Sequence, residues 1–197
     1  MYREIDNLSL DGEVLDLGGS TGSDYHALIK GKHNITTVNI DEEHLHDLSF
    51  NLEEVFPIED GKYNTVLAIN VMEHLFNYEQ FLKEIYRVLQ VNGTAIIAVP
   101  FLVQVHPSPK DYFRFTGDAL DRLINNAGFN NVSIKPIGRG PFTAANQIVY
   151  NSLKFGLVRG LCGLITTFLD ATLSLFDRKK SFGASRYPLG YFVVAKK

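Results

Sequence analysis

The sequence predicts an α/β fold built around a mostly parallel sheet. Apolar segments of strand length alternate with amphipathic segments of helix length along most of the chain. The first apolar segment, 13–17, leads into the glycine-rich segment 18–22, and a second apolar segment, 36–40, is followed by Asp41. A glycine-rich turn lets the backbone approach a ligand, and a carboxylate after the next strand can accept hydrogen bonds from a ribose diol. These features predict a pocket for an adenosine-containing cofactor.

The individual elements follow from periodicity and turn residues. The apolar residues of 78–89 recur at helical spacing and would share one face: Phe81, Leu82, Ile85, Val88 and Leu89. Asn92-Gly93 is expected to form a turn, Thr116 to cap the helix that follows it, and Gly128 to end that helix. We expect strands at 13–17, 36–40, 64–70, 94–99, 131–137 and 190–195, and helices at 23–29, 78–89 and 117–126.

Composition limits the classes of function. The chain has 197 residues, of which 45% are hydrophobic and 21% charged, so we expect one globular domain over residues 1–197. The net charge of −3 argues against nucleic acid as the main partner. The single cysteine, Cys162, excludes a disulfide framework, and the histidines lack metal-ligand spacing, so no metal is expected. The polar N-terminal residues lack an apolar signal segment, which predicts a cytoplasmic protein.

The segment Asp16-Leu17-Gly18-Gly19-Ser20-Thr21-Gly22 decides which cofactor is expected. It fails the dinucleotide fingerprint, because Ser20 and Ser23 stand at the second and third glycine positions. It resembles the first motif of class I S-adenosylmethionine (SAM) methyltransferases, which commonly reads hydrophobic-Asp-hydrophobic-Gly-x-Gly-x-Gly. Gly18 and Gly22 match the first and last glycines, and Ser20 replaces the middle one.

Three later segments resemble motifs of the same family, in the same order. Residues 51–64 look like its Asp-Leu-x-x-x-x-Pro-Phe-x-Asp-x-x-Phe-Asp segment, with Asn51 in place of the acid, and Asp47-Leu48 offers a second registration. Residues 66–75 resemble the fourth strand with its Glu-His turn, and 89–94 resemble the turn before the fifth strand. The resemblance implies a Rossmann-like sheet of seven strands in the order 3-2-1-4-5-7-6, the last antiparallel, with a helical insertion at about 139–188 between strands 6 and 7.

By this resemblance SAM lies over the C-terminal ends of strands 1, 2 and 4. Asp41 would hold the ribose hydroxyls, and Asn51 would meet the adenine amine through its amide oxygen. The residues implied to bind the cofactor are Asp16, Gly18, Gly19, Ser20, Gly22, Asp41, Asn51, Leu52, Asn70 and Val71.

Catalytic residues are expected in 100–116, just past the fifth strand. This stretch resembles Pro-Phe-x-x-x-x-His-x-x-Pro-x-Asp-Tyr-x-Arg-[Phe/Tyr]-Thr, found in a methyltransferase subgroup common among bacterial surface-polysaccharide enzymes. His106 is the candidate general base, because imidazole exchanges protons near neutral pH. Asp111 could orient that imidazole, act as the base or hold a sugar hydroxyl. Arg114 suits a phosphate or carboxylate, and Tyr112 could stack on a ring.

Structural roles are open for several of these residues. Asp111 and Arg114 could form a salt bridge that holds the loop, and His106 could be a hydrogen-bonding loop residue. His74 is expected to have a structural role in its turn.

Residues 156–176 form an apolar segment within the insertion. Only Arg159 and Asp170 are charged there, and 21 residues suffice to cross a membrane. Small or polar residues recur at spacings of three and four, however, which predicts an amphipathic helix, or two helices broken near 160–163: Arg159, Gly163, Thr166, Asp170, Ser174 and Asp177. The segment could cap the acceptor site, form a homodimer surface, or lie on the inner face of a membrane beside Arg178, Lys179 and Lys180.

The sequence thus predicts a SAM-dependent methyltransferase that acts on a hydroxyl of a small-molecule or glycan-type acceptor. A quinone or other lipid acceptor is the alternative that the apolar insertion favours. A SAM-binding protein without transfer activity is the alternative that Ser20 and Asn51 suggest.

Overall fold

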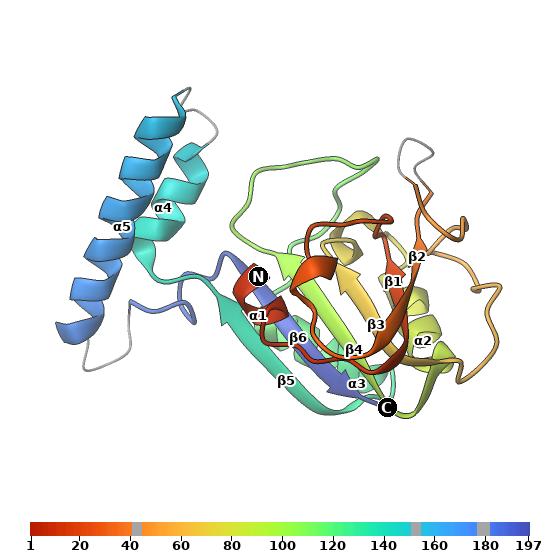
Figure 1. The fold of residues 1–197 in the computed structure, drawn as a ribbon. Coiled ribbons are helices and arrows are strands. Elements are labelled where there is room, and N and C mark those ends of the chain that lie inside the picture. The colour runs from red at the N-terminus through yellow and green to blue at the C-terminus, as the bar shows by residue number, and fades with distance from the viewer. Residues whose placement is uncertain (41–44, 151–154, 177–181) are drawn as a thin grey trace. The chain divides into compact units, whose positions relative to one another are not determined.

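A computed structural model describes the chain except for residues 41–44, 151–154 and 177–181. Figure 1 shows the elements of this structure as a ribbon. In chain order they are α1 (Tyr2–Ile5), β1 (Gly12–Leu17), the 3-10 turn η1 (His26–Leu28), β2 (His33–Val38), β3 (Tyr63–Ile69), the 3-10 turn η2 (Met72–His74), α2 (Tyr78–Val88), β4 (Leu89–Pro100), α3 (Gly117–Asn126), β5 (Asn130–Ile137), α4 (Pro141–Val149), α5 (Gly156–Phe176) and β6 (Gly190–Lys196).

The chain divides into two compact units. The first comprises Met1–Val99, Pro107–Ile134 and Phe192–Lys197, and the second comprises Pro100–His106 and Lys135–Tyr191. The second unit contains α4 and α5, which lie within the predicted insertion. The prediction of one domain over the whole chain stays a prediction.

The described strands form one sheet in the order β2-β1-β3-β4-β6-β5. β1 pairs in parallel with β2 and β3, and β3 pairs in parallel with β4. β6 runs antiparallel to β4, because Lys197 donates to the carbonyl of Gly93 at one end and Phe101 donates to Leu189 at the other. Beyond β2, the described residues contribute only an isolated bridge between Val38 and Leu48, so the predicted seven strands and their order are not confirmed.

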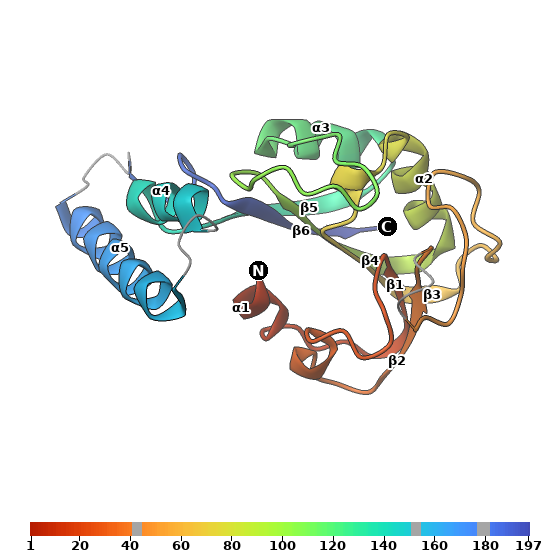
Figure 2. The ribbon, with the colours of Figure 1, turned by 90° about the horizontal axis from the view of Figure 1, so that it is seen from above.

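Helices cover both faces of the sheet in the first unit. Figure 2 shows α2 and α3 on one face and α1 on the other. α2 buries the apolar face that its periodicity predicts, including Phe81 and Ile85. α3 begins as predicted, because the Thr116 side chain accepts a hydrogen bond from the backbone N–H of Ala119 at 3.3 Å.

The predicted helix at 23–29 is wrong, since the structure has only the turn η1 there. Polar side chains in this segment bond locally instead of continuing a helix. Tyr25 and His26 both bond the Asp16 carboxylate, and the Ser23 hydroxyl donates to the Ser20 carbonyl. The expected helical turns are thereby replaced by a compact connection between β1 and β2.

The predicted turn at Asn92-Gly93 lies inside β4. Asn92 has φ +64°, and the pairing of β3 with β4 shifts register between Tyr63 and Thr65. An irregularity of this kind absorbs residues with turn-forming sequence without ending the strand.

Arg87 of α2 fixes the loop that leads from Asn51 toward β3. Its guanidinium donates to the carbonyls of Phe56 and Ile58 at 3.0 and 2.7 Å, and to the carboxylate of Glu84 at 2.6 Å. The Glu84 carboxylate also accepts from the Phe56 backbone N–H at 2.8 Å. Loop and helix are therefore joined by charge-assisted hydrogen bonds.

Candidate functional site

A cavity of about 440 Å³ lies at the C-terminal ends of β1, β2 and β3 in the first unit. This volume falls within the roughly 300–1,000 Å³ usual for small-ligand pockets. Its walls come from the glycine turn after β1, the end of β2, residues 50–53, the segment after β3, and residues 108–112. Ligands of open α/β sheets bind at this end of the strands.

The glycine turn forms one wall and admits no side chain at its first position. Gly18 has φ +82°, and a Cβ added there would lie 2.7 Å from Cγ2 of Val71. A Cβ on Gly19 would lie 2.0 Å from Oδ2 of Asp16. Gly18, Gly19 and Ser20 line the cavity, so bare backbone faces a ligand there.

Asp16 lies buried beneath this turn rather than on the cavity wall. Its Oδ2 accepts a hydrogen bond from the Tyr25 hydroxyl at 2.6 Å and lies 2.7 Å from Nε2 of His26. Burial and the Asp16 carboxylate both raise the pKa of Tyr25, so the phenol stays a donor. The other oxygen, Oδ1, is buried and has no partner among the described residues.

Asn39 stands at the end of β2 and lines the cavity. Its side-chain amide donates to the carbonyls of Gly18 and Gly19, both at 3.3 Å. Asp41, the predicted ribose ligand, lies outside the described residues. Asn39 was not identified from the sequence, although a polar residue at the end of the second strand was the available signal.

The structure distinguishes the two registrations of the predicted adenine-binding segment. Asn51 and Leu52 line the cavity, whereas the Asp47 carboxylate bonds the backbone N–H and hydroxyl of Thr37, both at 2.8 Å. These bonds lower the pKa of Asp47. The Asn51 amide oxygen accepts from the Glu53 backbone N–H at 3.0 Å and can accept a second hydrogen bond.

The segment after β3 brings Asn70 and Val71 to the cavity. Asn70 has φ +54°, in the left-handed region that asparagine tolerates better than most residues. Its backbone N–H donates to the Ala98 carbonyl at 2.8 Å. This conformation turns the chain away from the sheet toward η2.

Asp111 and Arg114 bond each other. The two guanidinium nitrogens lie 2.5 and 2.7 Å from the two carboxylate oxygens, and Arg114 also donates to the Phe113 carbonyl. The hydrogen bonds that Arg114 donates to Asp111 are the main cause that raises the pKa of Arg114. Neither residue lines the cavity, and the salt bridge that the sequence left open as an alternative is present.

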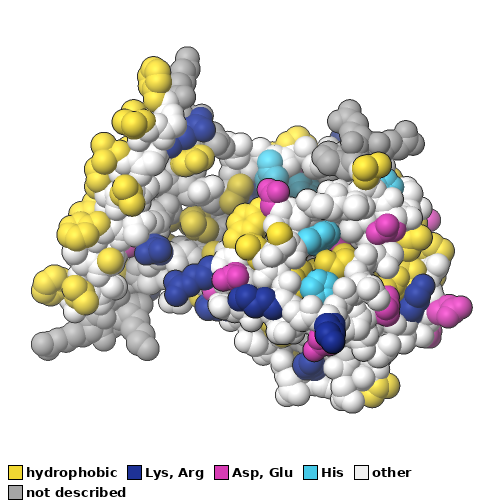
Figure 3. Space-filling model, in the orientation of Figure 1, with side chains coloured by type: hydrophobic (Ala, Val, Ile, Leu, Met, Phe, Trp, Pro, Cys, Tyr) yellow, Lys and Arg dark blue, Asp and Glu magenta, His cyan; other side chains and the backbone are white. Residues whose placement is uncertain are grey.

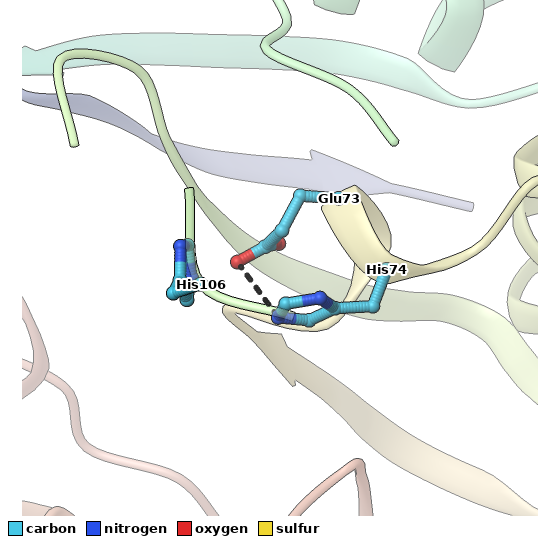
Figure 4. Close-up of side chains that lie close together, drawn as sticks. All are labelled: Glu73, His74 and His106. Carbon is cyan, nitrogen blue, oxygen red and sulfur yellow. Dashed lines mark ion pairs between the residues drawn. The ribbon is translucent and has the colours of Figure 1, made fainter. Parts of the chain in front are cut away.

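Glu73 and His74 form a pair, of which His74 alone was expected from the sequence to have a structural role. Figure 4 shows the two side chains, with Oε1 of Glu73 3.7 Å from Nε2 of His74. His74 lines the cavity, and its Nδ1 lies 2.5 Å from the carbonyl oxygen of Lys110. Burial raises the pKa of Glu73 to about 7, although the charge of Arg114 opposes the shift.

Residues 108–112 add Lys110 and Tyr112 to the cavity wall. The Tyr112 backbone N–H donates to the Glu73 carbonyl at 2.8 Å, which ties this segment to η2. The Tyr112 ring lies 5.4 Å from that of Phe76, and both side chains are exposed. The two rings offer an apolar surface beside the cavity.

His106 belongs to the second unit, where its Nδ1 lies 3.0 Å from the carbonyl oxygen of Gln104. The side chain is half-buried. Its assignment as general base stays a prediction.

The chain is similar to methyltransferases. Residues 15–97 match a family model described as a methyltransferase domain. Over 97 residues the chain is 29% identical to a probable S-adenosylmethionine-dependent methyltransferase of Mycobacterium tuberculosis. The aligned region covers 46% of this chain and 35% of that protein. The chain therefore spans about a third of the length of the curated relatives it matches.

Solved structures share the fold. A SAM-dependent methyltransferase from Archaeoglobus fulgidus aligns with a TM-score of 0.63 and 16% identity over 99% of this chain and 90% of that chain. Phosphoethanolamine N-methyltransferase 2 of Haemonchus contortus, in complex with SAM, aligns with a TM-score of 0.60 and 13% identity over 99% and 50%.

Proposed function

We propose that this chain, whose residues 15–97 form a class I SAM-dependent methyltransferase domain, transfers a methyl group to a hydroxyl of a small-molecule or glycan-type acceptor. The observation that carries the proposal is one cavity lined both by the Gly18–Gly19–Ser20 turn and by Lys110 and Tyr112, side chains suited to an acceptor. Cofactor and acceptor groups could meet in such a cavity.

The residues present fit SAM, the cofactor of such domains. Gly18 and Gly19 present bare backbone to the cavity, and a Cβ on either would collide with Val71 or Asp16, so the turn can stay close to a ligand. Gly18, Gly19, Ser20, Gly22 and Asp16 would hold the methionine and ribose portion. Asn51 and Leu52 would hold the adenine, Asp41 the ribose hydroxyls, and Asn70 and Val71 the region near the sulfur.

The acceptor side favours a ring that carries an anionic group. Tyr112 and Phe76 present exposed aromatic faces suited to the apolar face of a sugar. Lys110 lines the same cavity and supplies a cation for a phosphate or carboxylate. A nucleotide-linked or lipid-linked sugar, of the kind used in polysaccharide biosynthesis, has both features.

Bound SAM supplies an electrophilic methyl group, and alignment of the acceptor is the largest contribution expected of the protein. A hydroxyl acceptor also loses a proton, for which a positioned base contributes roughly 10²–10⁴-fold. We propose His106 as this base, with the Asp111–Arg114 pair holding the segment that carries Lys110 and Tyr112. His74 is a second candidate, because it lines the cavity and lies beside the buried Glu73.

Two alternatives remain within the same fold. A quinone or other lipid acceptor is favoured by the exposed apolar side chains of α5. A SAM-binding protein without transfer activity would keep the cavity and lack turnover. We propose a cytoplasmic location, with a position at the inner face of a membrane if α5 contacts lipid, and a homodimer if α5 pairs with a second copy.

The test is formation of S-adenosylhomocysteine from SAM with nucleotide-linked sugars, lipid-linked sugars and short-chain quinones as acceptors. The proposal expects turnover with a sugar acceptor and none without acceptor. Turnover with quinones alone would show that the acceptor is a lipid and not a sugar. SAM binding without turnover on any acceptor would favour the non-catalytic alternative.

Variants of the two histidines assign the base. His106→Ala should lower kcat by about 10²-fold or more while the SAM affinity persists, and His74→Ala should leave kcat within a few-fold. The reverse pattern would transfer the role to His74.

A further inference from the structure

Helix α5 turns its apolar side outward. Leu157 is 85% exposed, Leu164 71% and Phe168 68%, and Figure 3 shows hydrophobic side chains along the length of this helix. Its large apolar residues with more than a third of their surface exposed are Leu157, Val158, Leu161, Leu164, Ile165, Phe168, Leu175 and Phe176. We call these eight residues the outer face of α5. At 100° per residue they share one side of the helix.

The opposite side of α5 faces α4 and is fixed by a buried carboxylate. Asp170 is 4% exposed and accepts hydrogen bonds from the backbone N–H groups of Phe142 at 3.0 Å and Thr143 at 2.8 Å. These donors belong to the first turn of α4, whose N-terminal dipole stabilises an anion. The contact sets the rotation of α5, because turning the outer face inward would expose α4's first-turn amides and bury leucines in place of Asp170.

Three of the four hydroxyl groups of α5 donate to backbone carbonyls of the same helix. Thr166 donates to the Cys162 carbonyl at 2.8 Å, Thr172 to Leu169 at 2.8 Å, and Ser174 to Ala171 at 2.7 Å. Such bonds within the helix let these residues lie in an apolar medium at low cost.

We propose that α5 binds a lipid bilayer, lying in the plane of the interface with its outer face among the acyl chains. No charged side chain of α5 lies on the side of the outer face, and the one hydroxyl there, that of Thr172, donates within the helix, whereas protein–protein interfaces combine an apolar centre with a polar rim. The sequence continues after α5 with Asp177, Arg178, Lys179 and Lys180, whose net positive charge attracts anionic headgroups.

An interfacial position fits better than a span. α5 is long and apolar enough to cross a membrane by length and composition. Asp170 lies six residues before its end, about 9 Å along the axis, and holds the start of α4 there. β5 ends at Ile137, shortly before α4, so a spanning α5 would draw the end of this strand toward the hydrocarbon.

The experiment is co-sedimentation of the full-length protein with phosphatidylcholine vesicles, with and without phosphatidylglycerol. Wild type should sediment with both, and more strongly with the anionic lipid. The variant Leu161→Gln/Leu164→Gln/Phe168→Gln should bind more than roughly tenfold more weakly. Val55→Gln/Val91→Gln, which changes exposed apolar residues in the first unit, should bind as wild type does.

Separate measurements test whether the triple variant folds and whether the protein self-associates. SAM binding by the triple variant reports an intact first unit, and the single variant Leu164→Gln should show a smaller loss of vesicle binding if the triple variant misfolds. Wild type that stays in the supernatant contradicts the proposal. So does a wild-type dimer in light scattering that the triple variant converts to a monomer without any vesicle binding by either protein. Because vesicle binding is measured without acceptor, this result is independent of methyl transfer.

Discussion

Oε1 of Glu73 lies 3.7 Å from Nε2 of His74, and only His74 reaches the cavity wall. Glu73 is fully buried, so its carboxylate acts on the cavity through the imidazole. Such an arrangement orients a ring whose other nitrogen is already held by the Lys110 carbonyl. The pair therefore links a buried acid to the site (Figure 4).

Glu73→Gln should change how stability depends on pH. The pKa of Glu73 is raised from 4.5 to about 7, mainly by burial, so the folded protein holds a proton that the unfolded chain releases. Stability contributed by the protonated acid is present below pH 4.5 and is lost as pH rises toward 7. At about 1.4 kcal/mol per pH unit, wild type should lose roughly 3 kcal/mol of unfolding free energy relative to the variant.

Denaturant unfolding of both proteins at acidic and mildly alkaline pH measures this difference. Parallel stability curves for wild type and Glu73→Gln would contradict the assignment of a raised pKa to Glu73.

Gly18→Ala should weaken SAM binding by at least about tenfold. The new Cβ would lie 2.7 Å from Cγ2 of Val71, at a residue with φ +82°, and should displace the turn from the cavity. Gly61→Ala is the matched control, because Gly61 has φ +64° and the nearest atom to its added Cβ, the Leu89 carbonyl oxygen, lies 3.9 Å away. Calorimetric titration should show a far smaller loss of SAM affinity for Gly61→Ala, and equal losses would mean that backbone strain alone explains the effect.

Asp111→Asn should destabilise the protein by about 1–3 kcal/mol, because the Asp111 side chain is 2% exposed and its loss leaves a partly buried Arg114 without its two charged hydrogen bonds. Asp60→Asn removes an ion pair to Arg87 in which the aspartate side chain is 79% exposed, so thermal unfolding should show little change. Equal effects of the two substitutions would show that the Asp111–Arg114 pair is not a structural anchor.

Asn39→Ala should lower SAM affinity while leaving the fold intact. The variant loses the side-chain bonds to the carbonyls of Gly18 and Gly19, which tie the glycine turn to the end of β2. We expect about a tenfold loss by titration, since each neutral hydrogen bond contributes about 1 kcal/mol. Unchanged affinity would remove Asn39 from the site.

Much of the first unit could be predicted from the sequence. Strong periodicity predicts α2, and the Thr116 cap predicts the start of α3, because both signals are local. The helix predicted at 23–29 does not form, because Tyr25 and His26 bond Asp16 of the preceding strand. A contact between distant residues of this kind leaves no trace in the hydrophobic periodicity of the segment. Tertiary hydrogen bonds overrode helix propensity there.

The part of the candidate site that is formed by the backbone of the glycine turn could be predicted from the sequence. Gly18 marks a turn by its residue type alone, whereas Asn39 and Lys110 reach the cavity only through the way their segments fold. Asp111 and Arg114 show the same limit, because two residues with catalytic chemistry were equally suited to a salt bridge, and the structure forms the salt bridge.

Isothermal titration of the purified protein with SAM and, separately, with NAD tests whether the cavity at the ends of β1, β2 and β3 binds SAM. We expect micromolar binding of SAM, no binding of NAD, and SAM binding at least about tenfold weaker in Gly18→Ala. Binding of NAD, or no binding of SAM by a folded wild-type protein, would contradict this expectation.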